Sequence, residues 1–117
     1  MRNDRRMATS ERRASPRVPV VCAVLSRSAR RAQLLLAANI SREGMEVWRV
    51  RDEPLQPGKR VKLEFELPGR HRLISVDGVV VFDRDATRIG VAGVRFDTLD
   101  AEDARSIDEF VRELMAA

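Results

Sequence analysis

Two short polar stretches contain the side chains best suited to binding chemistry. The first runs from Arg13 to Arg17 (RASPR), and the second runs from Asn39 to Gly44 (NISREG). Arginine donates paired hydrogen bonds to phosphate oxygens or to guanine O6 and N7, while Asn and Ser side chains both donate and accept. These residue types predict recognition of an anionic ligand, with a nucleotide as the natural candidate.

The second stretch lies between two runs that read as β-strands, residues 32–38 and 45–50. In extended backbone, Asn39 and Ser41 would project to one side, and the residue between them would point into a core. Gly44 has no Cβ, so the chain there can take a positive φ or a ligand can approach the backbone closely. The stretch is therefore expected to be a polar corner at the end of a strand.

The arginine stretch comes directly before the first plausible strand, residues 18–25, and Pro16 favours extended or turn backbone at Ser15. Asn39 follows Arg17 by 22 positions, which is enough for one strand, a turn and a returning strand. The same Arg-x-x-x-Arg spacing recurs at residues 2–6 and 27–31, so position rather than pattern singles out this pair. We expect the two stretches to meet at one end of a small β-structure.

Arg-x-x-x-Arg followed by Asn-x-Ser-x-x-Gly resembles the PilZ domain family, and the resemblance extends from about Arg12 to Leu114. It implies an all-β fold, a six-stranded antiparallel β-barrel with a C-terminal α-helix. It also implies a ligand, the bacterial second messenger cyclic di-GMP, bound by Arg13, Arg17, Asn39, Ser41 and Gly44. Arg12, just before the motif, resembles the type that accommodates a stacked pair of ligands, and the choice between one and two ligands stays open.

The hydrophobic pattern agrees with a barrel. Apolar residues follow strand-like patterns in segments separated by turns, namely 18–25, 32–38, 45–50, 60–67, 73–82 and 88–96. Asp77 and Gly78 suggest a bulge, and residues 26–31 and 83–87 are expected to be turns. From Asp100, a suitable N-cap, apolar residues recur at helical spacing. We therefore predict an arginine loop at 12–17, a barrel at 18–97 and a helix at 100–115.

Length and composition indicate the general class of protein. The chain has 117 residues, 44% hydrophobic and 34% charged, which is typical of one soluble domain. No run approaches the roughly 20 apolar residues of a membrane span, and the charged N-terminus is unlike a secretory signal. We expect a cytoplasmic protein. Its single cysteine, Cys22, lies in an apolar strand pattern, which predicts a buried, inert thiol.

Positive charge is concentrated near the N-terminus. The formal charge is +4, and residues 1–31 hold nine arginines against only Asp4 and Glu11. Residues 1–11 lack apolar periodicity and are predicted to form a flexible basic tail, whose part in binding stays open. This distribution favours an anionic partner.

Catalysis and metal binding find little support. His71 has no second histidine or thiol cluster with which to build a metal site or a triad. Turn chemistry accounts for Asp77, Asp83 and Asp85, and packing in the core or on the barrel surface accounts for Trp48. We expect no enzyme activity, no metal and no cofactor.

Three functions remain as hypotheses. In the first, cyclic di-GMP orders the arginine loop and changes the surface shown to a partner protein, in motility, attachment or exopolysaccharide control by family precedent. In the second, the barrel is an adaptor that binds no ligand. In the third, it is a nucleic-acid-binding barrel, a hypothesis weakened by the absence of Tyr and the presence of only four Phe and one Trp for base stacking.

Overall fold

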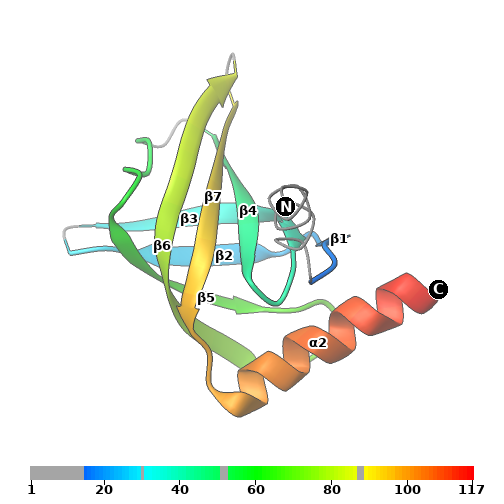
Figure 1. Ribbon diagram of the computed structural model, residues 1–117. Coiled ribbons are helices and arrows are strands. Elements are labelled where there is room, and N and C mark those ends of the chain that lie inside the picture. The colour runs from blue at the N-terminus through cyan, green and yellow to red at the C-terminus, as the bar shows by residue number, and fades with distance from the viewer. Residues whose placement is uncertain (1–14, 30, 51–52, 87–88) are drawn as a thin grey trace, which may run out of the picture.

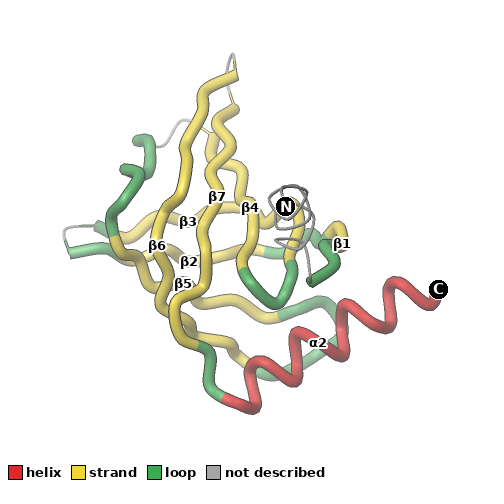
Figure 2. The backbone as a smooth tube through the Cα atoms, viewed as in Figure 1, coloured by secondary structure: helices red, strands yellow, loops and turns green. Residues whose placement is uncertain are grey.

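The computed structural model describes residues 15–29, 31–50, 53–86 and 89–117. Arg12, Arg13 and the predicted tail at 1–11 lie outside the described residues. The described chain forms strands followed by one long helix, shown in Figures 1 and 2. In chain order these are β1 (Val18–Pro19), β2 (Ala23–Arg27), β3 (Ala32–Ile40), β4 (Gly44–Val50), β5 (Arg60–Glu66), β6 (Leu73–Ala86), β7 (Ile89–Thr98) and α2 (Ala101–Ala116).

The strands form a closed antiparallel barrel. Hydrogen-bonded neighbours follow the order β1-β3-β2-β5-β6-β7-β4, and an additional β3–β4 pairing joins the two sides of the sheet. Strands β2 to β7 therefore make a six-stranded barrel, while the short β1 pairs with the end of β3. The predicted fold class is confirmed. Closure leaves these six strands without a free edge, which protects the backbone hydrogen-bonding groups of a small domain.

Strand β5 shows why the sequence specifies the barrel. Val61, Leu63 and Phe65 are buried in the interior, and the charged residues between them point outward. Burying one face of a strand of this kind removes apolar surface from water while the charges remain hydrated. The alternation predicted from the sequence for this segment is confirmed.

The first predicted strand, 18–25, is instead split into β1 and β2. Val18 pairs with Ile40 and Ala23 with Leu36, so four residues lie opposite three and one residue is extra. Such a bulge re-aims the side chains around it. Val21 is 74% exposed, so this apolar segment is not buried on both faces.

Two of the predicted turns also differ from the expectation. The predicted turn at 83–87 is wrong, because β6 continues as a strand to Ala86. The predicted turn at 26–31 begins later, because β2 extends to Arg27. The bulge predicted at Asp77 and Gly78 is confirmed by a shift in the β6–β7 register at that point. The predicted last strand started at Arg88, which lies outside the described residues.

The helix α2 lies across one end of the barrel (Figure 1). Asp100 caps it, its carboxylate accepting a 2.8 Å hydrogen bond from the Asp103 amide, and Ile107 is fully buried beneath it. Arg72 in the β5–β6 turn donates from Nε to Asp103 Oδ1 at 2.9 Å, which holds the first turn of the helix against the barrel. The predicted C-terminal helix is confirmed, and its apolar residues pack on the barrel.

A buried ion pair occupies the opposite end of the barrel interior. Arg49 on β4 donates from Nε to Asp83 Oδ2 at 3.0 Å and from Nη2 to Asp83 Oδ1 at 2.5 Å, and both side chains are at most 6% exposed. Hydrogen bonding to Asp83 raises the pKa of Arg49 despite burial, so the guanidinium stays charged. Asp83 and Asp85 are thus strand residues that neutralise an inward arginine, contrary to their expected role in a turn.

Cys22 is only partly buried, and burial raises the pKa of its thiol. Because the thiolate is the reactive form, we expect native Cys22 to react more slowly with a disulfide reagent at pH 7 than the same residue in denaturant. Stopped-flow labelling in both states checks this prediction. Equal rates in the native and unfolded protein would contradict it.

Candidate functional site

Three polar side chains from separate parts of the chain converge on the outside of the barrel. Arg17 Nη1 donates to Asn39 Oδ1 at 3.0 Å and to Glu46 Oε2 at 3.5 Å. Asn39 Nδ2 donates to Glu46 Oε1 at 3.1 Å. We call Arg17, Asn39 and Glu46 the polar cluster. It brings the arginine stretch and the strand corner together, as their spacing predicted.

Strand β1 is what positions Arg17. Val18 pairs with Ile40, and both side chains are buried in the core. Pro19 pairs with Asn39, and lacking an N–H it suits this short strand, whose one partner is β3. These anchors hold Arg17 just outside the barrel, where its guanidinium reaches Asn39. The arginine remains partly exposed and can meet a ligand from solvent.

Ser41 differs from its expected position. Strand β3 ends at Ile40, and Ser41 is 2% exposed rather than projecting beside Asn39. Its Oγ accepts a 3.1 Å hydrogen bond from the Glu43 amide, and its own amide donates to the Gly44 carbonyl at 2.9 Å. Hydroxyl side chains favour turns of this kind because they satisfy a nearby backbone donor. Ser41 therefore shapes the β3–β4 turn.

Gly44 is needed for a close approach between strands. A Cβ built there would lie 2.3 Å from the carbonyl oxygen of Val94 on β7, and Gly44 is not among the glycines with positive φ. Of the two reasons suggested by the sequence, positive φ is therefore excluded. The close neighbour in the structure is the backbone of β7, with which Gly44 pairs at Arg95.

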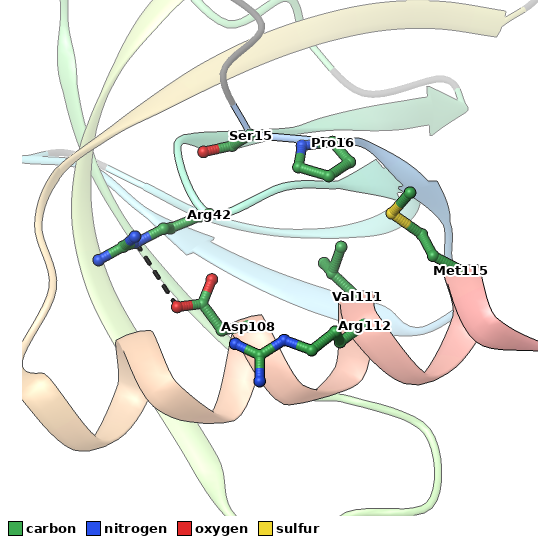
Figure 3. Close-up of a pocket in the computed structure, with 7 residues that line it drawn as sticks. All are labelled: Ser15, Pro16, Arg42, Asp108, Val111, Arg112 and Met115. Carbon is green, nitrogen blue, oxygen red and sulfur yellow. Dashed lines mark ion pairs between the residues drawn. The ribbon is translucent and has the colours of Figure 1, made fainter.

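A cleft of about 240 Å³ borders the site on the side of α2 (Figure 3). Its walls come from Ser15 and Pro16 in the arginine stretch, from Arg42 in the β3–β4 turn and from α2 between Asp108 and Met115. Arg42 Nε lies 3.7 Å from Asp108 Oδ2, an ion pair that links the strand-corner motif to the helix. Ser15 and Pro16 of the arginine stretch lie across this cleft from α2.

Other surfaces of the described chain offer less chemistry. A larger cleft of about 730 Å³ lies between the β2–β3 and β4–β5 connections, where Arg31 pairs with Glu53 at 2.6 Å. It contains no residue of either motif. Trp48, 43% exposed, lies on the outer face of the barrel between Leu36 and Val91, which agrees with packing on the barrel surface. Among the described residues, no group of His, Cys, Asp and Glu could hold a metal ion.

The comparison with known families decides the assignment. The model of the PilZ domain family matches residues 11–113. The chain belongs to the PilZ domain family. The resemblance inferred from the two motifs is confirmed over nearly the full length of this PilZ domain. No curated protein sequence matches it.

Solved structures share the fold of this PilZ domain at low sequence identity. The Bacillus subtilis inhibitor of motility, MotI/DgrA, is similar with a TM-score of 0.79 at 20% identity, over 89% of this chain and 51% of its own. The PilZ domain of Escherichia coli YcgR with c-di-GMP has a TM-score of 0.73 at 16% identity, over 90% and 92%. The K. pneumonia MrkH–c-di-GMP complex has a TM-score of 0.76 at 17% identity, over 89% and 52%. The PilZ domain described here thus spans about half the length of MotI/DgrA and MrkH.

Sequence reasoning missed Glu46. On β4 it is the outward residue between the inward Met45 and Val47, and it lies opposite Asn39 on β3. The signal that could have found it is this cross-strand register, since polar residues paired across an antiparallel ladder lie close enough to interact. Locating Glu46 needs the register of β3 against β4, which the bulge between Ala37 and Asn39 shifts by one residue.

In the described part of the chain, no helix has the length and apolar character needed to cross a membrane.

Proposed function

We propose that this PilZ domain is a receptor for cyclic di-GMP, which it binds on the outer surface of the barrel at the polar cluster. The observation that supports the proposal is the convergence of Arg17 with Asn39, because it places a bidentate donor beside an amide at the junction of the two family motifs. The family membership and the c-di-GMP in the YcgR and MrkH structures point to the same ligand.

In this proposal the arginine stretch closes over the ligand. Arg17 donates to guanine or phosphate from the edge of β1, and Arg13 donates from the preceding segment. Ser41 and Gly44 hold the shape of the corner, because one satisfies the turn and the other allows β4 to meet β7. Arg12 is proposed to accommodate a second, stacked ligand.

The proposed output is a change in surface presented to a partner protein. Ser15 and Pro16 face α2 across the cleft of Figure 3, so ordering of the arginine stretch by ligand would alter the helix surface nearby. We propose a cytoplasmic regulator without catalytic activity of its own. The partner belongs to motility, attachment or exopolysaccharide control, and the structural similarity to MotI/DgrA, an inhibitor of motility, is in keeping with the first.

Calorimetric titration of cyclic di-GMP at two salt concentrations tests the proposal. We expect wild type to bind, and Arg17→Ala to bind more than about tenfold more weakly, because hydrogen bonds to a charged group contribute about 1.5–3 kcal/mol. Ser41→Ala should weaken binding less, because its hydroxyl acts through the turn. A stoichiometry of two ligands per chain would support the role proposed for Arg12.

Arg27→Ala is the matched control, since it removes the same charge from another Arg-x-x-x-Arg spacing at the far end of β2. Its affinity should equal that of wild type. Equal losses in Arg17→Ala and Arg27→Ala, together with a steep fall with salt, would indicate general phosphate attraction and favour the nucleic-acid hypothesis. Absence of binding by wild type at either salt concentration would leave the adaptor hypothesis.

A further inference from the structure

The polar cluster contains a carboxylate that neither motif includes. Glu46 lies on β4 opposite Asn39, and its side chain is 30% exposed. One of its oxygens accepts from Asn39 Nδ2 at 3.1 Å, and the other lies 3.5 Å from Arg17 Nη1. A partly exposed acid at the centre of a site for an anionic ligand needs a reason, because it opposes binding of phosphate.

The amide of Asn39 is already engaged on both sides. Its oxygen accepts from Arg17 and its nitrogen donates to Glu46, so it bridges the two charged groups. A carboxylate has about four lone-pair positions on its two oxygens, and Glu46 uses two of them in this cluster. Glu46 therefore has the greater remaining capacity to accept hydrogen bonds from a ligand.

Guanine presents a matching edge. Its O6 acceptor lies beside two donors, N1–H and the N2 amino group, and its N7 is a further acceptor. An amide side chain presents only one acceptor oxygen, whereas a carboxylate presents two and can accept from N1–H with one oxygen and from the N2 amino group with the other. Arg17 supplies the donor for O6 and N7. Arg17 Nη1 and Glu46 Oε2 lie 3.5 Å apart. A donor therefore stands beside an acceptor, which matches the O6 acceptor and the adjacent N1–H donor of guanine.

Resting on the proposed function, we propose that Glu46 is the residue that selects guanine in the ligand. Its carboxylate accepts from guanine N1–H and N2–H, Arg17 donates to the O6 and N7 side, and Asn39 positions both groups. Adenine is rejected because its unprotonated N1 would place a lone pair against the carboxylate, leaving that acceptor without a donor. The Glu46 carboxylate therefore weakens the attraction of the site for phosphate but allows the site to distinguish guanine from adenine.

The test compares three cyclic dinucleotides, in which the base is guanine, hypoxanthine or adenine, on wild type and Glu46→Gln. Hypoxanthine keeps O6 and N1–H but lacks the N2 amino group. For wild type we expect affinity to fall about tenfold from guanine to hypoxanthine and further to adenine. In Glu46→Gln, affinity for cyclic di-GMP should fall about tenfold or more, and the preference for guanine over hypoxanthine should largely disappear.

Glu43→Gln is the control, because it removes an exposed carboxylate from the β3–β4 turn, just before the strand that carries Glu46, and should leave all three affinities unchanged. Thermal unfolding of each variant confirms that the barrel remains folded under the titration conditions. If Glu46→Gln binds cyclic di-GMP as tightly as wild type or more tightly, Glu46 is only a counter-ion for Arg17 and the inference is overturned. Absence of binding of every dinucleotide to wild type overturns the proposed function as well, so the two failures are distinct.

Discussion

Replacing Asp83 with alanine is expected to lower the free energy of unfolding by about 3–5 kcal/mol, because it leaves the Arg49 guanidinium buried without the carboxylate that accepts two of its hydrogen bonds. The same change removes the acceptor of the Leu55 amide, which donates to Asp83 Oδ2 at 3.0 Å. Urea denaturation followed by circular dichroism measures the loss.

Asp85→Ala provides the matched control. It removes another carboxylate from the same guanidinium, but the Asp85 side chain is 73% exposed, whereas that of Asp83 is 5% exposed. Exposed ion pairs contribute about 0–1 kcal/mol, so this variant should lose less than about 1 kcal/mol. Similar losses of unfolding free energy in Asp83→Ala and Asp85→Ala would contradict the expectation that the buried carboxylate contributes more to stability than the exposed one. The double variant Arg49→Met with Asp83→Leu should recover much of the stability, since no unpaired buried charge remains.

Gly90 explains why the ion pair fits inside the barrel. It pairs with Arg49 across β4 and β7, and a Cβ at Gly90 would lie 2.4 Å from the guanidinium carbon. The arginine therefore occupies the space that a side chain on β7 would fill. Arg49 follows Met45 and Val47 at period two, so its inward direction was readable from the sequence. Its partner 34 residues away was not, because that pairing depends on the register of three strands.

Elements with a single buried face could be predicted from the sequence. Strand β5 and helix α2 have uninterrupted periods of two and 3.6 residues, and both occur close to their predicted bounds. The segment from Val18 to Arg27 could not, since one extra residue moves every later side chain to the other face and leaves no trace in composition. The same limitation hid the bulge beside Asn39 and the burial of Ser41.

The candidate site was predictable in part for a similar reason. The 22-residue spacing of Arg17 and Asn39 fits a hairpin, and the structure joins them at 3.0 Å. Glu46 lies seven residues after Asn39 and meets it across β3 and β4, through a register that no motif encodes. Site residues carried by a motif are visible in sequence, whereas those supplied by strand pairing become visible only once the register is known.

Gly44→Ala is expected to destabilise the barrel by about 3 kcal/mol, because its Cβ would lie 2.3 Å from the Val94 carbonyl oxygen and 3.2 Å from Arg95 Cα. These are backbone atoms of a paired strand, so the clash can be removed only if β4 and β7 separate where Gly44 pairs with Arg95. The difference in unfolding free energy between Gly44→Ala and wild type should be the same whether both proteins are free or both are saturated with cyclic di-GMP. Thermal and urea unfolding of the variant measure it.

The comparison with Glu43→Ala isolates the strand contact. Glu43 is exposed, its amide still donates to Ser41 Oγ after the change, and its carbonyl still accepts from the Phe96 amide. That variant should retain wild-type stability within about 0.5 kcal/mol. If Gly44→Ala proved as stable as wild type yet bound cyclic di-GMP weakly, the glycine would serve ligand approach instead of strand packing. Loss of stability with binding retained in the folded fraction assigns the motif glycine to the barrel, and leaves recognition to the polar cluster beside it.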